Sequence, residues 1–192
     1  MVLKQFEQHM LVDYCLNSNI SKEVCCVILL LMQGGMMPSE VKRLKEDSIC
    51  LDAEIPHLVV KGDTKTRARK RVVPLVMAVD FIKENIGIAI EWLNRTTDTN
   101  HSARIKKVMA KALNTTGYTG HCLRHAFKNN AMANGADLGK ASIIAGWSTT
   151  GGFSEQMLSY GSQGLAQTEV LRGLYKENMI IHKHLMDYSD MR

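Results

Sequence analysis

The residues best suited to chemistry in this chain are a histidine and an arginine close together and a tyrosine further along. His121 and Arg124 are three residues apart, a spacing that places both side chains on one face of a helix. Tyr160 lies in the polar, glycine-containing segment 159–162. Arginine and histidine can hold a phosphodiester and stabilise added negative charge, and a tyrosine hydroxyl can attack phosphorus. The combination predicts cleavage of a DNA strand through a covalent phosphotyrosine.

The position of the His121/Arg124 pair strengthens this interpretation. The polar stretch 115–120 precedes it, so both side chains are expected in the first turn of a helix, where free N–H groups and the helix dipole favour phosphate. A His-x-x-Arg pair alone is more often a surface or capping arrangement. Tyr160 alone could be a surface tyrosine. Tyr175, the next candidate, fits less well because it lies within the periodic pattern of the last predicted helix.

Helices are expected to form most of the scaffold around these residues. Hydrophobic periodicity and turn residues predict helices over 4–17, 21–33, 38–45, 77–93, 102–113, 121–134, 138–145 and 166–186. Three short strands, 48–51, 57–60 and 70–75, predict a small antiparallel sheet with a positively charged hairpin. The helix 21–33 is apolar nearly all round, which predicts a central core helix with Ser21 as its N-cap. Asn178 interrupts the apolar stripe of the last helix.

The charge distribution indicates a polyanionic partner. The net charge is +5, and half of the 24 lysines and arginines lie in segments 61–71 and 101–130, which contain one acidic residue, Asp63. Basic charge gathered in this way is typical of nucleic-acid binding. The alternative is a pair of solvated charged faces.

Cysteine usage and apolar runs indicate a reduced protein of the cytoplasm. The five cysteines are odd in number and have no CxxC spacing, so we expect neither a disulfide framework nor structural zinc. The apolar run 24–32 is too short to span a bilayer, and the N-terminus lacks the layout of a signal peptide. We therefore expect no membrane partner.

Four segments in order resemble the motifs of tyrosine recombinases, the phage integrase family. The segments are 35–41, similar to the first catalytic box; 63–66 with 71–75, similar to the β-hairpin lysine motif; and 121–127 and 134–148, similar to the C-terminal catalytic signature. Their joint occurrence is specific, although no single segment is.

This resemblance implies an α+β, mainly α fold: one catalytic domain over residues 1–192 with a small three-stranded antiparallel sheet, lacking the family's N-terminal core-binding domain. It implies site-specific cutting and rejoining of double-stranded DNA, with no metal and no other cofactor. The expected protein is a monomer when free and self-associates on DNA as a tetrameric synapse. Its expected location is the bacterial cytosol or nucleoid, encoded by a phage or another mobile element.

The resemblance also implies a role for each matched residue. Tyr160 is the nucleophile, which forms a 3′-phosphotyrosyl link and frees a 5′-hydroxyl. Arg124 clamps the non-bridging oxygens, and His121 hydrogen-bonds the scissile phosphate or helps to move the tyrosine proton. Lys65 protonates the leaving 5′ oxygen, with Lys61 as the alternative.

Two further positions follow from the same resemblance. Trp147 occupies a position that is His in many members and Trp in some; its indole can donate to phosphate but cannot shuttle a proton. Glu40 is the acidic neighbour that supports the first box. Structural readings stay open, because Trp147 could be a core aromatic and Lys65 only one of several phosphate contacts. The DNA-binding candidates are Lys61, Arg67, Arg69, Lys70, Arg71, Lys106 and Lys107.

The chain departs from the family pattern at Met37, where the first box has an arginine before the Pro-Ser-Glu segment. Losing one charged donor to the transition state costs a factor of about 10²–10³ in rate. Arg43 is nearly two helical turns away and does not fit as a replacement. Three explanations stay open: a degenerate DNA-binding relative, a variant disabled at this position, or another basic residue that partly restores the chemistry.

A second departure is the distance from Trp147 to Tyr160, which are 13 residues apart. We interpret the extra length as a loop that holds Tyr160 out of the site until DNA or a partner chain orders it. The helix 166–186 could either dock on a neighbouring protomer or pack on its own domain. Alternatives to an active recombinase are a non-catalytic DNA-binding protein on the same scaffold, a type IB topoisomerase-like enzyme, and an unrelated helical protein with chance motifs.

Overall fold

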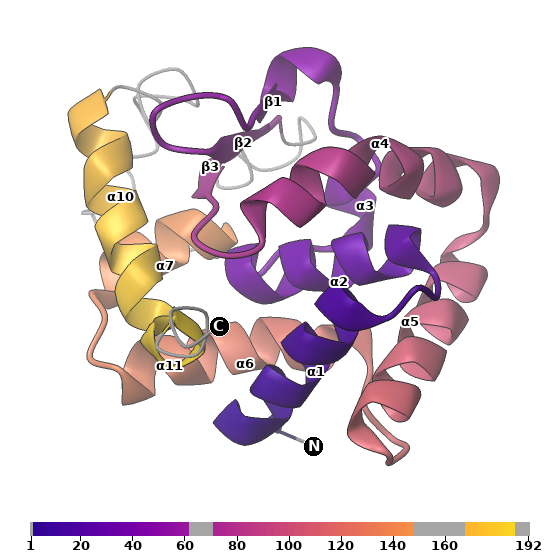
Figure 1. Ribbon diagram of the computed structural model, residues 1–192. Helices are drawn as coiled ribbons and strands as arrows, with labels where there is room; N and C mark the ends of the chain where they lie inside the picture. Colours follow the sequence, from indigo (N-terminus) through magenta and orange to yellow (C-terminus); the bar gives the residue numbers. More distant parts are fainter. Residues whose placement is uncertain (1, 62–70, 148–167, 187–192) are drawn as a thin grey trace.

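Helices dominate the fold, and a small sheet lies at one edge (Figure 1). The computed structural model describes residues 2–61, 71–147 and 168–186. In chain order the elements are α1 (Gln5–Asn17), α2 (Lys22–Gly34), α3 (Pro38–Val41), the 3₁₀ turn η1 (Glu46–Ser48), β1 (Ile49–Cys50), β2 (His57–Val60), β3 (Arg71–Pro74), α4 (Val79–Arg95), α5 (Asp98–Leu113), α6 (Gly120–Ala133), α7 (Leu138–Ala145), α10 (Thr168–Ile181) and α11 (Lys183–Met186). The prediction of a mainly helical α+β fold is confirmed.

The sheet has the predicted three antiparallel strands, in the order β1-β2-β3. Leu58 on β2 pairs with Ile49 on β1 and with Val73 on β3. Leu58 and Val73 are fully buried, and α7 and α10 pack against β3. Strand β3 therefore lies between β2 and the helices α7 and α10.

Helix α2 is the centre of the core, as its sequence predicts. Every residue from 24 to 34 is buried, and α1, α4, α5 and α6 all pack against it. Ser21 is the N-cap residue, but its side chain makes no capping hydrogen bond. Instead, the Ser21 hydroxyl accepts a hydrogen bond from Arg104 of α5 at 3.1 Å. The start of the core helix α2 is thus fixed to α5 by the hydrogen bond between Ser21 and Arg104.

Three predicted helices differ from the structure by more than two residues. Helix α3 ends at Val41 instead of 45, because the N–H groups of Arg43 and Leu44 donate only three residues back, to the carbonyls of Glu40 and Val41. Helix α5 begins at Asp98 instead of 102, because the Thr97 hydroxyl caps it by accepting from the Asn100 N–H at 3.4 Å. The last helix does not continue to 186 but breaks at His182. There, the Leu185 N–H donates to the His182 carbonyl, a three-residue step in place of the α-helical four.

Asn178 explains the interruption in the apolar stripe of the last helix. It is fully buried, and its amide donates to the carbonyls of Gln33 at 3.1 Å and Pro74 at 2.7 Å. A buried polar side chain is tolerated when it is hydrogen-bonded in this way. Asn178 thereby joins α10 to the ends of α2 and β3, so the described part of this helix packs on its own domain.

His182 makes stability depend on pH. It is fully buried, and burial lowers its pKa to about 4, against an unfolded value of about 6.5. As the pH falls, the unfolded chain binds a proton at this histidine before the folded chain does. The contribution of neutral, buried His182 to the free energy of unfolding is therefore fully present above pH 6.5 and is lost as the pH falls toward 4. We expect a loss of about 3 kcal/mol over this interval in urea titrations. His184, whose pKa burial also lowers to about 4, acts in the same direction.

The variant His182→Gln tests the origin of that loss. It should flatten the pH dependence of the free energy of unfolding between pH 6.5 and 4. An equal slope in wild type and His182→Gln would assign the effect to other groups.

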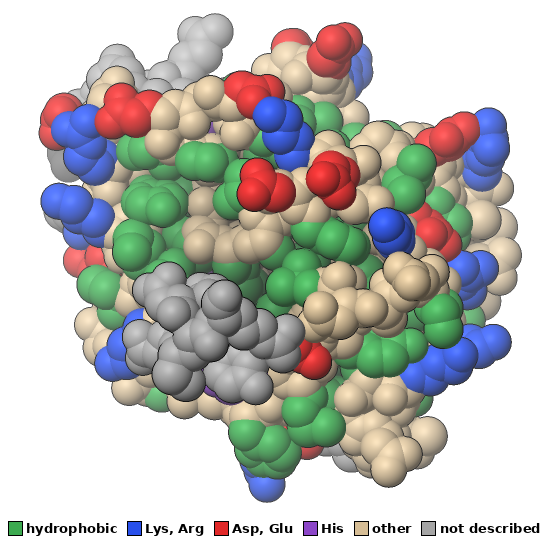
Figure 2. Space-filling model, viewed as in Figure 1, with side chains coloured by type: hydrophobic (Ala, Val, Ile, Leu, Met, Phe, Trp, Pro, Cys, Tyr) green, Lys and Arg blue, Asp and Glu red, His purple; other side chains and the backbone are tan. Residues whose placement is uncertain are grey.

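The surface of the described residues carries scattered charge and some apolar side chains. On the face shown in Figure 2, acidic and basic side chains are scattered over the surface, with apolar side chains between them. Phe6 and Met10 of α1 are among the exposed large apolar residues. All five cysteines are free thiols. None of the helices that the structure describes is long and apolar enough to cross a membrane.

Candidate active site

Three hollows adjoin one another around Met37, His121 and Arg124. The first hollow, of about 400 Å³, is lined by His121 and Arg124. The second, of about 290 Å³, is lined by Met37 and His121. The third, of about 260 Å³, is lined by Met37 and Arg124. Since each of these residues borders two hollows, the three side chains surround one depressed region of the surface.

The start of α6 gives this region its polar donors. His121 and Arg124 lie in the first turn of α6, where the sequence predicts them. Thr119, Gly120 and His121 all line the second hollow, so the N-terminal end of the helix borders it. The Thr119 side chain makes no capping hydrogen bond within the described residues. Free N–H groups at such an end attract anions.

The Arg124 guanidinium is held from two sides. One of its nitrogens donates to the backbone carbonyl of Gly35, the first residue of the first box. The guanidinium also lies over the Trp147 ring, 5.7 Å from its centroid. Trp147 in turn meets Phe127 of the core edge-on, with the ring centroids 5.8 Å apart. Trp147 is therefore both packed on the core and in contact with the arginine of the site.

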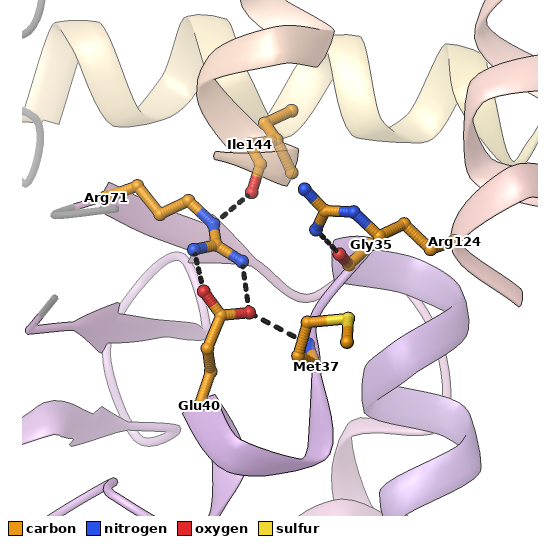
Figure 3. A network of polar contacts seen from close by, with 6 residues as sticks. All are labelled: Gly35, Met37, Glu40, Arg71, Arg124 and Ile144. Atoms are coloured by element: carbon orange, nitrogen blue, oxygen red, sulfur yellow. Dashed lines mark hydrogen bonds and ion pairs between the residues drawn. The ribbon is translucent and has the colours of Figure 1, made fainter. Parts of the chain in front are cut away.

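A buried ion pair between Arg71 and Glu40 lies next to this region (Figure 3). Arg71 Nη1 is 2.6 Å from Glu40 Oε1, and Nη2 is 3.0 Å from Oε2. The Arg71 side chain is fully buried, and that of Glu40 is 12% exposed. Burial pushes the pKa of Glu40 up, but the hydrogen bonds and charge of Arg71 outweigh it and hold the pKa below its usual value.

This pair ties three elements together. Arg71 of β3 also donates from Nε to the Ile144 carbonyl of α7 at 2.7 Å. Glu40 of α3 accepts the Met37 N–H at 2.8 Å. The pair thus fixes the backbone of the first box relative to the end of α7, which leads into Trp147. Because Arg71 is fully buried, it does not present its guanidinium to DNA, in contrast to the expectation of a DNA contact.

Gly146 leaves room for this guanidinium. It has a positive φ of 65°, and a Cβ built there would lie 2.7 Å from Arg71 Nη1. Gly146→Ala should therefore lower the free energy of unfolding, measured in urea, for two reasons. The positive φ costs an alanine about 1–2 kcal/mol, and the crowding of its Cβ against Arg71 costs about 1–3 kcal/mol more. Gly135→Ala is the matched control, since Gly135 has a φ of 73° but nothing within 4 Å of its Cβ position. Equal losses in the two variants would contradict the close approach.

The comparisons with known proteins identify the family. Residues 1–151 match the model of the phage integrase family. The chain belongs to the phage integrase family. Its members are tyrosine recombinases, which are enzymes. The resemblance seen in the sequence motifs is therefore confirmed.

A solved structure agrees on the fold of this phage integrase family member. The integrase from mycobacterium phage Brujita superimposes with a TM-score of 0.57 at 18% sequence identity, over 92% of this chain and 57% of that one. At this identity the likeness concerns the fold. The chain spans 57% of the length of that integrase. No curated protein matches the chain.

Of the predicted site residues, those in the described part of this integrase-family chain gather at one place. Met37, Glu40 and Arg124 line the third hollow, while His121 and Trp147 join Arg124 in the first. The predicted residues Lys65, Arg67, Arg69, Lys70 and Tyr160 lie outside the described residues.

The remaining candidates lie on the described surface. Lys61 forms an exposed ion pair with Asp47 at 2.5 Å. Lys106 and Lys107 are exposed on α5, and Lys106 lines the second hollow. Tyr175 lies on α10, where it is partly buried and packed against the core.

Two basic residues of the first hollow were missed by the sequence interpretation. His125 and Lys128 line it together with His121 and Arg124. The His125 ring meets the His121 ring edge-on, with the centroids 4.5 Å apart. The signal was present in the sequence, because His125 and Lys128 each follow a predicted site residue by four positions, one helical turn.

The chemistry of the region is that of an anion site. Arg124 and the donors of α6 face a depression in which Glu40, whose charge Arg71 neutralises, is the only carboxylate among the described lining residues. Within residues 2–61, 71–147 and 168–186, no group of three or more His, Cys, Asp or Glu could hold a metal ion. A planar guanidinium matches two oxygens of a phosphodiester, so the region can bind DNA phosphate.

Proposed function

We propose that this member of the phage integrase family cuts and rejoins duplex DNA at specific sites through a 3′-phosphotyrosine on Tyr160. The observation that carries the proposal is the placement of Arg124 and His121 in the first turn of α6, where both border adjoining hollows. Family membership supports the same chemistry.

The proposed reaction exchanges one phosphoester bond for another. The Tyr160 oxygen attacks the scissile phosphorus, and the bond from phosphorus to the 5′ oxygen breaks as the new bond forms. His121 accepts the tyrosine proton, and Lys65 gives a proton to the leaving 5′ oxygen. The phosphotyrosine conserves the bond energy, so attack by a 5′-hydroxyl reverses the step and rejoins DNA without a nucleotide cofactor.

The protein contributes stabilisation of the pentacoordinate transition state. Arg124 pairs with the non-bridging oxygens, and its contacts to the Gly35 carbonyl and the Trp147 ring hold it ready for this role. Trp147 donates its indole N–H to a phosphate oxygen. Met37 offers no charge, so we infer that the chemical step is slow.

Double-stranded DNA is the proposed partner, with self-association into a synapse on it. Lys61, Lys106 and Lys107 are exposed and can contact backbone phosphates. Binding through such contacts weakens steeply as salt is raised. The proposed setting is the bacterial cytosol or nucleoid, where a phage or another mobile element recombines.

Met37 favours a second candidate function, a DNA-binding relative that does not cleave. The missing guanidinium is not replaced by Arg71, which is buried and occupied by Glu40 and the Ile144 carbonyl. Such a protein would bind DNA with the same salt dependence and would never become covalently attached to it.

Covalent trapping separates these functions. The chain is incubated with nicked duplexes of randomised sequence, and DNA that stays attached after denaturation is recovered. We expect a low yield of adduct that Tyr160→Phe abolishes and Tyr175→Phe retains. DNA binding without any adduct, also after Arg replaces Met37, would favour the second candidate.

A further inference from the structure

Lys106 lies beside the gap that Met37 leaves in the site. Both residues line the second hollow, of about 290 Å³, together with His121. Lys106 comes from α5, whereas Met37 directly precedes α3 and His121 lies in the first turn of α6. A cation of α5 is thus brought next to the position where the family's first box carries its arginine.

The other cations near the site do not fill this gap. Arg71 is fully buried, and its guanidinium is bound by Glu40 and by the Ile144 carbonyl. Arg124 lines the first and third hollows but not the second. Lys128 lines the first hollow, which Met37 does not border. Among the described lysines and arginines that line these three hollows, Lys106 is therefore the one that borders the hollow shared by Met37 and His121.

The surroundings of Lys106 leave its ammonium group available. The residue is exposed, and no carboxylate of the described residues forms an ion pair with it. Ser102, one helical turn earlier on the same face of α5, lines the same hollow. A lysine ammonium has three donors on a flexible four-carbon chain. It can therefore reach a phosphate from several directions, whereas the planar guanidinium of an arginine requires one orientation.

We propose that Lys106 supplies the second positive charge on the scissile phosphate, on the side of His121 away from the first hollow, in place of the arginine missing at position 37. This inference rests on the proposed function, because it assumes that a DNA phosphate occupies the depression. In this role Lys106 contacts the non-bridging oxygens opposite Arg124. Helix α5 would then take part in catalysis through Lys106, in addition to its contacts with the DNA backbone.

Titration with inorganic phosphate, followed by amide NMR shifts, tests the site without DNA. Saturable shifts are expected at Gly120 and His121, and Lys106→Ala should weaken the phosphate affinity by about tenfold, as expected for a charge-assisted hydrogen bond. The control is Lys111→Ala, which removes the same charge from the exposed last turn of α5 and should change the affinity less than about twofold. Equal losses in the two variants, or a loss that follows Lys128→Ala instead, would overturn the proposal.

A double-mutant cycle then tests the replacement of the missing arginine. Covalent trapping is measured for Lys106→Ala in the wild-type and Met37→Arg backgrounds. We expect a loss of about 10-fold or more in the wild-type background and less than about threefold with Arg at position 37. Equal losses in both backgrounds would refute the replacement and leave the recombinase chemistry standing. If phosphate binding depends on Lys106 but no background gives an adduct, the anion site stands and the recombinase function fails.

Discussion

Replacing Met37 with arginine should raise the rate of covalent adduct formation by about 10²-fold, the lower end of the effect of one charged donor, because Lys106 already supplies part of the charge. Met37 is 40% exposed and lines two of the three hollows, so an arginine side chain can enter the depression without being buried. Its backbone N–H is already fixed by Glu40, which sets the direction from which the new side chain starts. The guanidinium would then face the phosphate beside Arg124. The measurement is the initial rate of DNA attachment to the nicked duplexes.

A change in net charge alone must be separated from this effect. Met10→Arg adds the same charge on α1, at a methionine that is 43% exposed and away from the hollows. This variant should change the rate by less than about threefold, since exposed charges beyond the screening length contribute little. A Met37→Arg rate equal to that of wild type would mean that position 37 does not face the scissile phosphate.

Removing the Arg71 guanidinium should cost the largest share of stability of any single change in the site. Arg71→Met leaves the Glu40 carboxylate buried without its counter-ion, which typically costs about 3–5 kcal/mol. The same change removes the link to the Ile144 carbonyl, so the end of α7 and Trp147 lose their fixed position relative to the first box. Urea unfolding at pH 7 measures the loss.

The pairing with Glu40 can be checked by removing the charge that is left behind. In Arg71→Met/Glu40→Gln the neutral amide still accepts the Met37 N–H, so part of the lost stability should return. Arg71→Lys should be only a partial substitute, because an ammonium cannot bridge both Glu40 oxygens and the Ile144 carbonyl with a planar fork. A loss below about 1 kcal/mol in Arg71→Met would place this pair with ordinary surface salt bridges.

The periodic parts of the fold could be predicted from the sequence. The unbroken apolar run of α2 predicts a core helix, and the short alternating segments predict the three strands. The break at His182 could not be predicted, since it depends on tertiary contacts between α10 and the rest of the core. The early start of α5 had a local signal in Thr97, a good N-cap residue that lies just before Asp98.

In the site, too, features set by residues close in the sequence could be predicted, and features set by distant residues could not. The spacing of His121 and Arg124 is local, and the structure keeps both in one turn of α6. The inward turn of Arg71 is not local, because its partner Glu40 is 31 residues earlier in the chain. Its charge and its place in a basic run predict that Arg71 is exposed, and its burial follows from the packing of β3 against α7, which the sequence does not show.

The central claim is that Tyr160 attacks a phosphate held by Arg124 and the start of α6, and identification of the attached residue tests it most directly. The Met37→Arg adduct is digested with nuclease and protease, and the peptide that carries the remaining nucleotide is sequenced by mass spectrometry. The account predicts a nucleotide on Tyr160, and loss of the adduct in Arg124→Ala. A nucleotide on Tyr175 or another residue, or an adduct that survives Arg124→Ala unchanged, would contradict it.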